Sequence, residues 1–160
     1  METSWALDRL TWPEVGRCLA RDPRLIIPVG ALEQHGPHLP LGTNVLIAER
    51  VAHAVSSRSG VLTAPAFWYG VAVGGGPFAG AAGLRRKTFH RAINELLARW
   101  EDDGVTEFIF VTAHQSNPKL TRFLQDIDAL VLFKPVSTVD LVHNISLVLN
   151  RTQAKRKLDR

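Results

Sequence analysis

The chain of 160 residues contains one cysteine, Cys18, so it can form no internal disulfide bond and no cysteine-based metal cluster. It also lacks an apolar run of the roughly 20 residues that a membrane-spanning helix needs. Its first ten residues have neither the basic start nor the apolar stretch of a secretory signal peptide. These absences lead us to expect a cytoplasmic protein that does not associate with a membrane.

The formal net charge of +4 comes from one end of the chain. Residues 151–160 hold five of the 19 Lys and Arg residues and one of the 15 Asp and Glu residues, which leaves 14 of each sign in residues 1–150. The basic end has no interleaved aromatic residues, so it does not favour nucleic-acid binding. We expect a single domain over residues 1–150, a basic tail over 151–160, and no nucleic-acid partner.

Apolar runs alternate with segments whose apolar residues recur at helical spacing. The short apolar runs predict buried strands at 25–29, 61–64, 108–111 and 130–133. Helical spacing predicts helices at 12–19, from 43 or 44 to about 56, at 86–102, from 118 onward, and at 138–150. Thr11 is expected to cap the first helix, and Thr43 or Asn44 the second. The alternation predicts an α/β fold with three layers, α/β/α, around a mostly parallel sheet.

The loop after the first predicted strand places Glu33 and His35 two residues apart. Ligands of open α/β sheets collect beyond the carboxyl ends of the strands, where this loop begins. A carboxylate oxygen and an imidazole nitrogen suit zinc, manganese or iron. The alternative is that both are ordinary polar loop residues, but the glycines and prolines between 30 and 42 specify the course of the loop, which favours a metal site.

Two later segments extend this site. His114 follows the predicted strand 108–111 in the same way that His35 follows 25–29, so both histidines are expected at one edge of the sheet. The glycine-rich segment 65–83 is a long loop in which Trp68 and Tyr69 are expected to form a wall for a substrate, whereas packing on the core is the alternative for its aromatic residues.

These segments together resemble the creatininase (creatinine amidohydrolase) family. The resemblance rests on PVGALEQHGPHLPLGTN at 28–44, PAFWYG at 65–70, FAG at 78–80 and VTAHQSN at 111–117, and it extends from about residue 7 to 140. It implies a metal-dependent hydrolase of cyclic or linear amides with two divalent ions, commonly zinc or manganese. It also implies a ring-like homo-oligomer and a small-molecule amide as substrate.

Carried over residue by residue, the resemblance implies that Glu33, His35 and His114 are metal ligands. Asn44 stands where the family has a bridging Asp, and Ser116 where creatininase-type members have a second Glu. Because the neutral amide of Asn44 is a poor bridge, we expect one ion, or a weakened two-ion site. Glu33 and His114 are then expected to hold the ion, with either His35 or the side-chain carbonyl of Asn44 as the third ligand.

Two loop residues, His38 and Gln115, are candidates for a catalytic general acid, and the residues do not decide between them. The chain is shorter than is usual in the family, so a truncated member is expected. Two functions stay open at this point. The chain is either a metal-dependent hydrolase of an amide C–N bond, or a catalytically inactive relative that serves assembly or small-molecule binding.

Overall fold

The computed structural model describes residues 5–71 and 78–112 of the chain. The described elements alternate between helix and strand. In chain order they are the 3-10 helix η1 (Leu7–Arg9), α1 (Trp12–Arg21), β1 (Arg24–Val29), α2 (Thr43–Ser59), β2 (Leu62–Thr63), α3 (Arg86–Asp102) and β3 (Glu107–Thr112). The strands and helices predicted beyond residue 112 and the predicted tail at 151–160 lie outside the described residues. Among the described helices, none combines the length and the hydropathy required to cross a bilayer.

The described strands form one parallel sheet in the order β2-β1-β3. β1 pairs with β3 along its whole length, from Arg24 opposite Glu107 to Val29 opposite Thr112. The carboxyl ends of these two strands are therefore level. The loop after β1 begins beside the residue at which β3 ends, as the sequence predicts for the two histidine-bearing segments.

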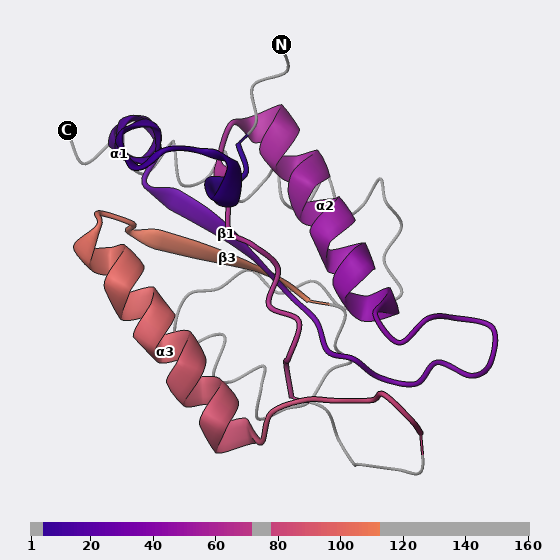
Figure 1. The fold of residues 1–160 in the computed structure, drawn as a ribbon. Helices are drawn as coiled ribbons and strands as arrows, with labels where there is room; N and C mark the ends of the chain where they lie inside the picture. Colours follow the sequence, from indigo (N-terminus) through magenta and orange to yellow (C-terminus); the bar gives the residue numbers. More distant parts are fainter. Residues whose placement is uncertain (1–4, 72–77, 113–160) are drawn as a thin grey trace.

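Alternate residues of β1 face opposite helical layers because side chains of a strand point to opposite faces. Leu25 and Ile27 belong to a core cluster that includes residues of α1 and α3. Ile26 faces the other way and packs with Ala52 and Val55 of α2. Figure 1 shows α2 on one side of the strands and α3 on the other. The predicted three-layer α/β/α arrangement with a parallel sheet is confirmed.

The start of β1 holds a buried cation that the apolar pattern did not indicate. Arg24 is 2% exposed, and its Nε donates to Oδ1 of Asp22 at 2.7 Å while Nη2 contacts the other carboxylate oxygen. The hydrogen bond from Arg24 to Asp22 raises the pKa of the guanidinium, with a smaller contribution from the charge of Glu107. Arg24 therefore stays charged in the core, where the carboxylate of Asp22 at the start of the strand holds its guanidinium.

The start of α2 differs from the sequence expectation. Its N-cap is Gly42, and neither Thr43 nor Asn44 caps the helix. The hydroxyl of Thr43 donates instead to the carbonyl of Pro40 at 2.6 Å, and the amide of Asn44 donates to Glu33. The prediction was wrong because both side chains bond to the preceding loop, which closes back onto the helix.

The predicted cap of α1 is confirmed. Thr11 precedes the helix, and both its N–H and its hydroxyl donate to Oε2 of Glu14, at 2.8 and 2.6 Å. These two hydrogen bonds lower the pKa of the Glu14 carboxyl. The bounds of α3 agree with the predicted helix at 86–102, and Gly104 follows its end with a φ of 99°, the left-handed conformation that favours glycine.

Candidate metal centre

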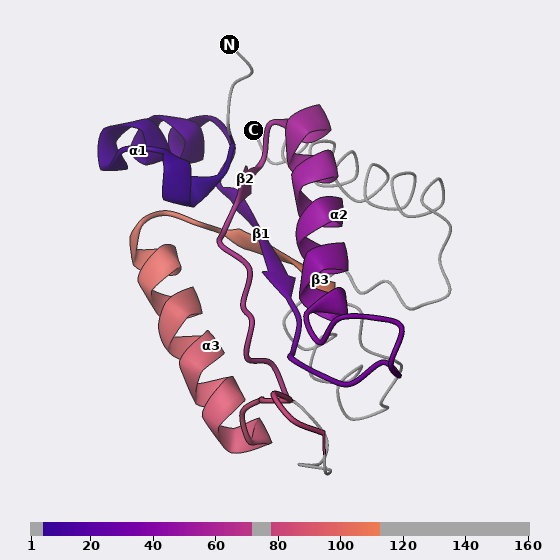
Figure 2. The ribbon, with the colours of Figure 1, turned by 45° about the vertical axis from the view of Figure 1, so that its right-hand side comes forward.

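The loop between β1 and α2 lies at the carboxyl edge of the sheet, beside the segment that follows β2 (Figure 2). The N–H of Gly30 donates to the carbonyl of Phe67 at 2.9 Å, and the N–H of Gly70 donates to the carbonyl of Gly30 at 2.8 Å. The N–H of Ala82 then donates to the carbonyl of Leu32 at 2.9 Å. Backbone pairing thus continues past the end of the sheet and fixes the first part of the loop between two other segments.

Two glycines permit this close approach. A Cβ at Gly30 would lie 2.6 Å from the backbone nitrogen of Val45, in the first turn of α2. A Cβ at Gly70 would lie 2.5 Å from the carbonyl oxygen of Gly30. Since each obstacle is a backbone atom, no side-chain rotation can relieve it. Because Gly30 and Gly70 carry no side chain, the loop can lie directly against α2 and against the segment 65–71 that follows β2.

Glu33 is held by its backbone and by its carboxylate. Its N–H donates to the carbonyl of Leu41 at 3.1 Å, across the loop. Its Oε2 accepts a hydrogen bond of 2.8 Å from Nδ2 of Asn44, and both side chains belong to half-buried residues. The structure therefore brings together two of the four predicted ligand positions. The contact between them joins a donor to an acceptor and does not aim two oxygens at one point.

His35 carries an unsatisfied polar atom. Its Nε2 is buried and has no hydrogen-bond partner among the described residues. Buried side-chain nitrogens nearly always have a partner, and the imidazole nitrogen is the commonest protein ligand of transition metals. The carboxylate of Glu33 and this nitrogen are a donor pair that fits a divalent ion such as zinc or manganese.

The described residues do not complete a metal centre by themselves. Within 5–71 and 78–112, no three His, Cys, Asp or Glu side chains come together in a way that could hold an ion. The third predicted ligand, His114, lies outside the described residues, as do Ser116 and the general-acid candidate Gln115.

His38 occupies a different position from His35. It is exposed, and its ring lies over Gly36, where an added Cβ would be 3.0 Å from Nδ1. Gly36 has a φ of 75° and its N–H donates to Oε1 of Gln34 at 2.9 Å, which forms a tight turn between the two histidines. The structure separates a half-buried imidazole, whose Nε2 is buried, from an exposed one, and the general-acid role of His38 stays a prediction.

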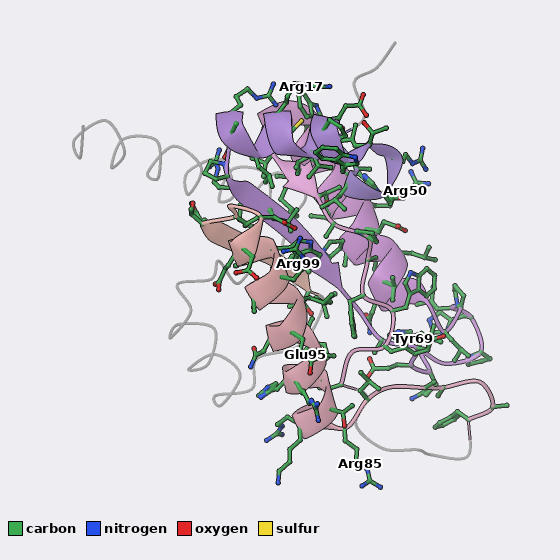
Figure 3. The ribbon with its side chains drawn as sticks, turned by 60° about the vertical axis from the view of Figure 1, so that its left-hand side comes forward. Arg17, Arg50, Tyr69, Arg85, Glu95 and Arg99 are labelled. Carbon is green, nitrogen blue, oxygen red and sulfur yellow. The ribbon has the colours of Figure 1, made fainter. Side chains whose placement is uncertain are left out.

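The aromatic residues that follow β2 have two different environments, one in the core and one at the surface, which correspond to the two alternatives that the sequence left open. Phe67 packs into the core, edge-on against Phe89 with ring centroids 5.6 Å apart. Trp68 and Tyr69 are 39% and 53% exposed. A Cβ at Gly42 would lie 3.2 Å from Cζ3 of Trp68, so the indole covers the point where the loop joins α2. Figure 3 shows Tyr69 far from Arg17 of α1, toward the end of the molecule where the loop lies.

Comparison with known proteins identifies the family. The sequence model of the creatininase family, described as creatinine amidohydrolase, matches residues 8–156. The chain belongs to the creatininase family. This confirms the resemblance drawn from the four sequence segments, and the three-layer fold described above is the one that family membership implies.

Curated relatives in this family are hydrolases of different substrates. The chain is 32% identical over 123 residues to a creatinine amidohydrolase of Pseudomonas putida, covering 73% of this chain and 47% of that protein. It is 34% identical over 112 residues to a mycofactocin precursor peptide peptidase of Mycobacterium ulcerans, covering 62% of this chain and 43% of that protein. The chain thus spans about half the length of the curated relatives it matches.

Solved creatininase structures share the fold and name the metals. A crystal structure of creatinine amidohydrolase (creatininase) matches with a TM-score of 0.70 and 28% identity, covering 82% of this chain and 58% of that one. Two further solved forms, at 28% identity and TM-scores of 0.69 and 0.70, are named as a Zn-Zn type and as a manganese creatininase. Creatininase structures therefore carry the two metals that the sequence led us to expect.

Proposed function

We propose that this member of the creatininase family is a metal-dependent hydrolase of an amide C–N bond. The observation that carries the proposal is the buried Nε2 of His35, which has no hydrogen-bond partner among the described residues and lies in the same short loop as the carboxylate of Glu33. A nitrogen buried without a partner is costly unless a ligand such as a metal ion completes its environment.

The proposed ligands are Glu33, His35 and His114. Thr112, the last residue of β3, lies opposite Val29 at the base of the loop. His114 follows Thr112 by two positions in the sequence, which is why it is proposed as the third ligand. Three protein ligands and an open position are the usual set of a catalytic zinc site, and manganese accepts the same donor types.

Once bound, a divalent ion would acidify a water molecule and polarise the amide carbonyl of the substrate. The protein's own contribution is to hold Glu33 on a loop fixed by backbone pairing. Trp68 and Tyr69, which are exposed on the segment paired with that loop, are the proposed wall for the substrate. An aromatic wall next to a small polar site suits a small amide, cyclic or linear. The names of the two relatives, which refer to creatinine and to a peptide, support both substrate types.

One observation favours a second candidate, a catalytically inactive relative that serves assembly or small-molecule binding. Asn44 stands at the bridging position and uses its amide as a donor to Glu33, so it brings no negative charge to the site. Either proposal includes a homo-oligomer, in which a neighbouring subunit could provide further residues to the site. Either also includes a cytoplasmic location.

A turnover assay separates the two functions. The chain is incubated with creatinine or a short peptide in the presence of Zn²⁺ or Mn²⁺, and the products are followed by liquid chromatography. We expect metal-dependent turnover that falls at least about tenfold in His35→Ala and is unchanged in His53→Ala, a matched loss of an exposed imidazole on α2. Metal binding without turnover of any amide would support the inactive relative. Turnover that persists with a chelator present would contradict the proposal.

A further inference from the structure

The side chain of Asn44 bonds directly to a proposed metal ligand. Its Nδ2 donates to Oε2 of Glu33 over 2.8 Å. A carboxylate accepts hydrogen bonds and has none to donate, so the chemistry of the pair places the amide nitrogen, and not the amide oxygen, toward Glu33. An amide nitrogen is a donor and not a metal ligand. The atom by which Asn44 reaches the site therefore cannot coordinate an ion.

We infer that Asn44 is a positioning residue, which orients Glu33 toward a single bound ion. This inference rests on the proposed function, because it takes Glu33 as a ligand. The hydrogen bond is accepted by Oε2, and Oε1 of Glu33 is the oxygen proposed for coordination. Groups that hydrogen-bond to a ligating carboxylate fix its orientation, and their loss typically weakens metal affinity by about 10- to 100-fold.

The position of Asn44 suits this role. It lies in the first turn of α2, where Val45 lies so close to Gly30, the residue after β1, that a Cβ at Gly30 would be 2.6 Å from the backbone nitrogen of Val45. A donor on a helix is placed more rigidly than one on a loop. Glu33 lies on the loop, where its own N–H bonds to the carbonyl of Leu41. Asn44, on the helix, thus fixes the carboxylate of Glu33, on the loop.

The chemistry of Asn44 favours one ion over two. A bridging carboxylate offers one oxygen to each of two dications and a negative charge to offset them, whereas Asn44 has one neutral oxygen, Oδ1. The chain is therefore expected to bind one ion where its two-metal relatives, such as the Zn-Zn form of creatininase, bind two.

Calorimetric titration with Zn²⁺ tests the inference on the full chain. Wild type should bind one ion per chain, and Asn44→Ala should bind one ion about 10- to 100-fold more weakly. Thr43→Ala is the matched control. The side chain of Thr43, also in the first turn of α2, bonds to the preceding loop as that of Asn44 does, but its partner is the carbonyl of Pro40 and not Glu33. Its zinc affinity should stay within about twofold of wild type, since no group that orients a ligand is lost.

The outcomes separate this inference from the proposed function. Two ions per wild-type chain, equal affinity of Asn44→Ala and wild type, or an equal loss in Thr43→Ala would overturn the positioning role while the hydrolase proposal stands. No zinc binding by wild type would overturn both.

A second readout uses the wild-type fold. In a ¹⁵N-labelled chain, the side-chain amide signal of Asn44 is assigned by its absence from Asn44→Ala and followed as Zn²⁺ is added. A positioning residue keeps its N–H···O bond, so the protected amide proton should persist in the zinc-bound state. Loss of that protection on zinc binding would show that the amide leaves Glu33 to coordinate through Oδ1, and would contradict the inference.

Discussion

Replacing Gly30 by alanine should destabilise the chain at the junction between β1 and the loop that leads to α2. The added Cβ would lie 2.6 Å from both the backbone nitrogen and Cγ2 of Val45, whereas ordinary contacts begin at 3.4 Å. The start of α2 must therefore retreat by about 0.8 Å, against a core in which Val45 is fully buried. Overpacking of this kind costs about 1–3 kcal/mol.

Gly16→Ala is the matched control with the opposite sign. Gly16 lies inside α1, and a Cβ there would have nothing within 4 Å. Alanine in a helix interior is more stable than glycine by about 0.5–1 kcal/mol. The two variants, which differ from wild type by the same methyl group, should thus differ from each other by about 1.5–4 kcal/mol.

Urea denaturation followed by tryptophan fluorescence measures this difference as a shift of the midpoint at constant slope. Because the displaced helix turn also carries Asn44, Gly30→Ala should in addition weaken zinc binding, while Gly16→Ala should leave it unchanged. If Gly30→Ala were as stable as wild type, the close approach of β1 to α2 would not be a constraint on the loop, and the reasoning from this contact would be refuted.

Three further predictions concern the rest of the described fold. Asp22→Asn removes the carboxylate that binds buried Arg24, and it should lower the free energy of unfolding, measured by urea denaturation, by about 3 kcal/mol. A decrease below a few tenths of a kcal/mol would show that other groups suffice to hold the guanidinium. Glu14→Gln should be less stable than wild type at pH 7, and the difference in stability should shrink as the pH falls through the lowered pKa of Glu14. The reason is that a carboxyl whose pKa is depressed in the folded state stabilises the fold only while it is ionised. Thermal melts of both proteins from pH 3 to 7 measure this difference. Gly104→Ala, with open space but a φ of 99°, should lower stability by about 1–2 kcal/mol, opposite in sign to Gly16→Ala.

The sequence predicted the elements whose physics is local. The apolar stripe of α3 and the glycine after it define that helix from Arg86 to Asp102, because helical period and a left-handed C-terminal residue are both encoded in neighbouring residues. The apolar run of β1 likewise predicted a buried strand, and the order of strands and helices predicted the parallel three-layer fold.

Features that depend on tertiary contact were not predictable in the same way. The start of α2 looked like a site for a side-chain cap, but Asn44 instead meets Glu33, a residue eleven positions away that only the closure of the loop brings near. Arg24 was not recognised as buried, because its burial depends on the carboxylate of Asp22 and on pairing with β3. Sequence spacing cannot reveal such pairs, since the chain must fold before the partners are neighbours.

The candidate site is predictable in part for a chemical reason. Glu33 and His35 stand out because a carboxylate and an imidazole follow a buried strand, and the structure adds that Nε2 of His35 is buried with no partner among the described residues. Their joint role with His114 stays a prediction, since His114 lies outside those residues. The hydrogen bond by which Asn44 is proposed to orient Glu33 forms only once the loop has folded back onto α2.

Metal content is the measurement that tests the proposed site most directly. The chain is purified without chelator, supplied with Zn²⁺ or Mn²⁺, desalted, and analysed by inductively coupled plasma mass spectrometry alongside His35→Ala, His114→Ala and the control His53→Ala. The proposed site predicts one ion per chain in wild type and in His53→Ala, and a large loss in the other two variants. Wild-type protein that retains no more metal than a chelator-treated blank, or full retention in both His35→Ala and His114→Ala, would contradict it.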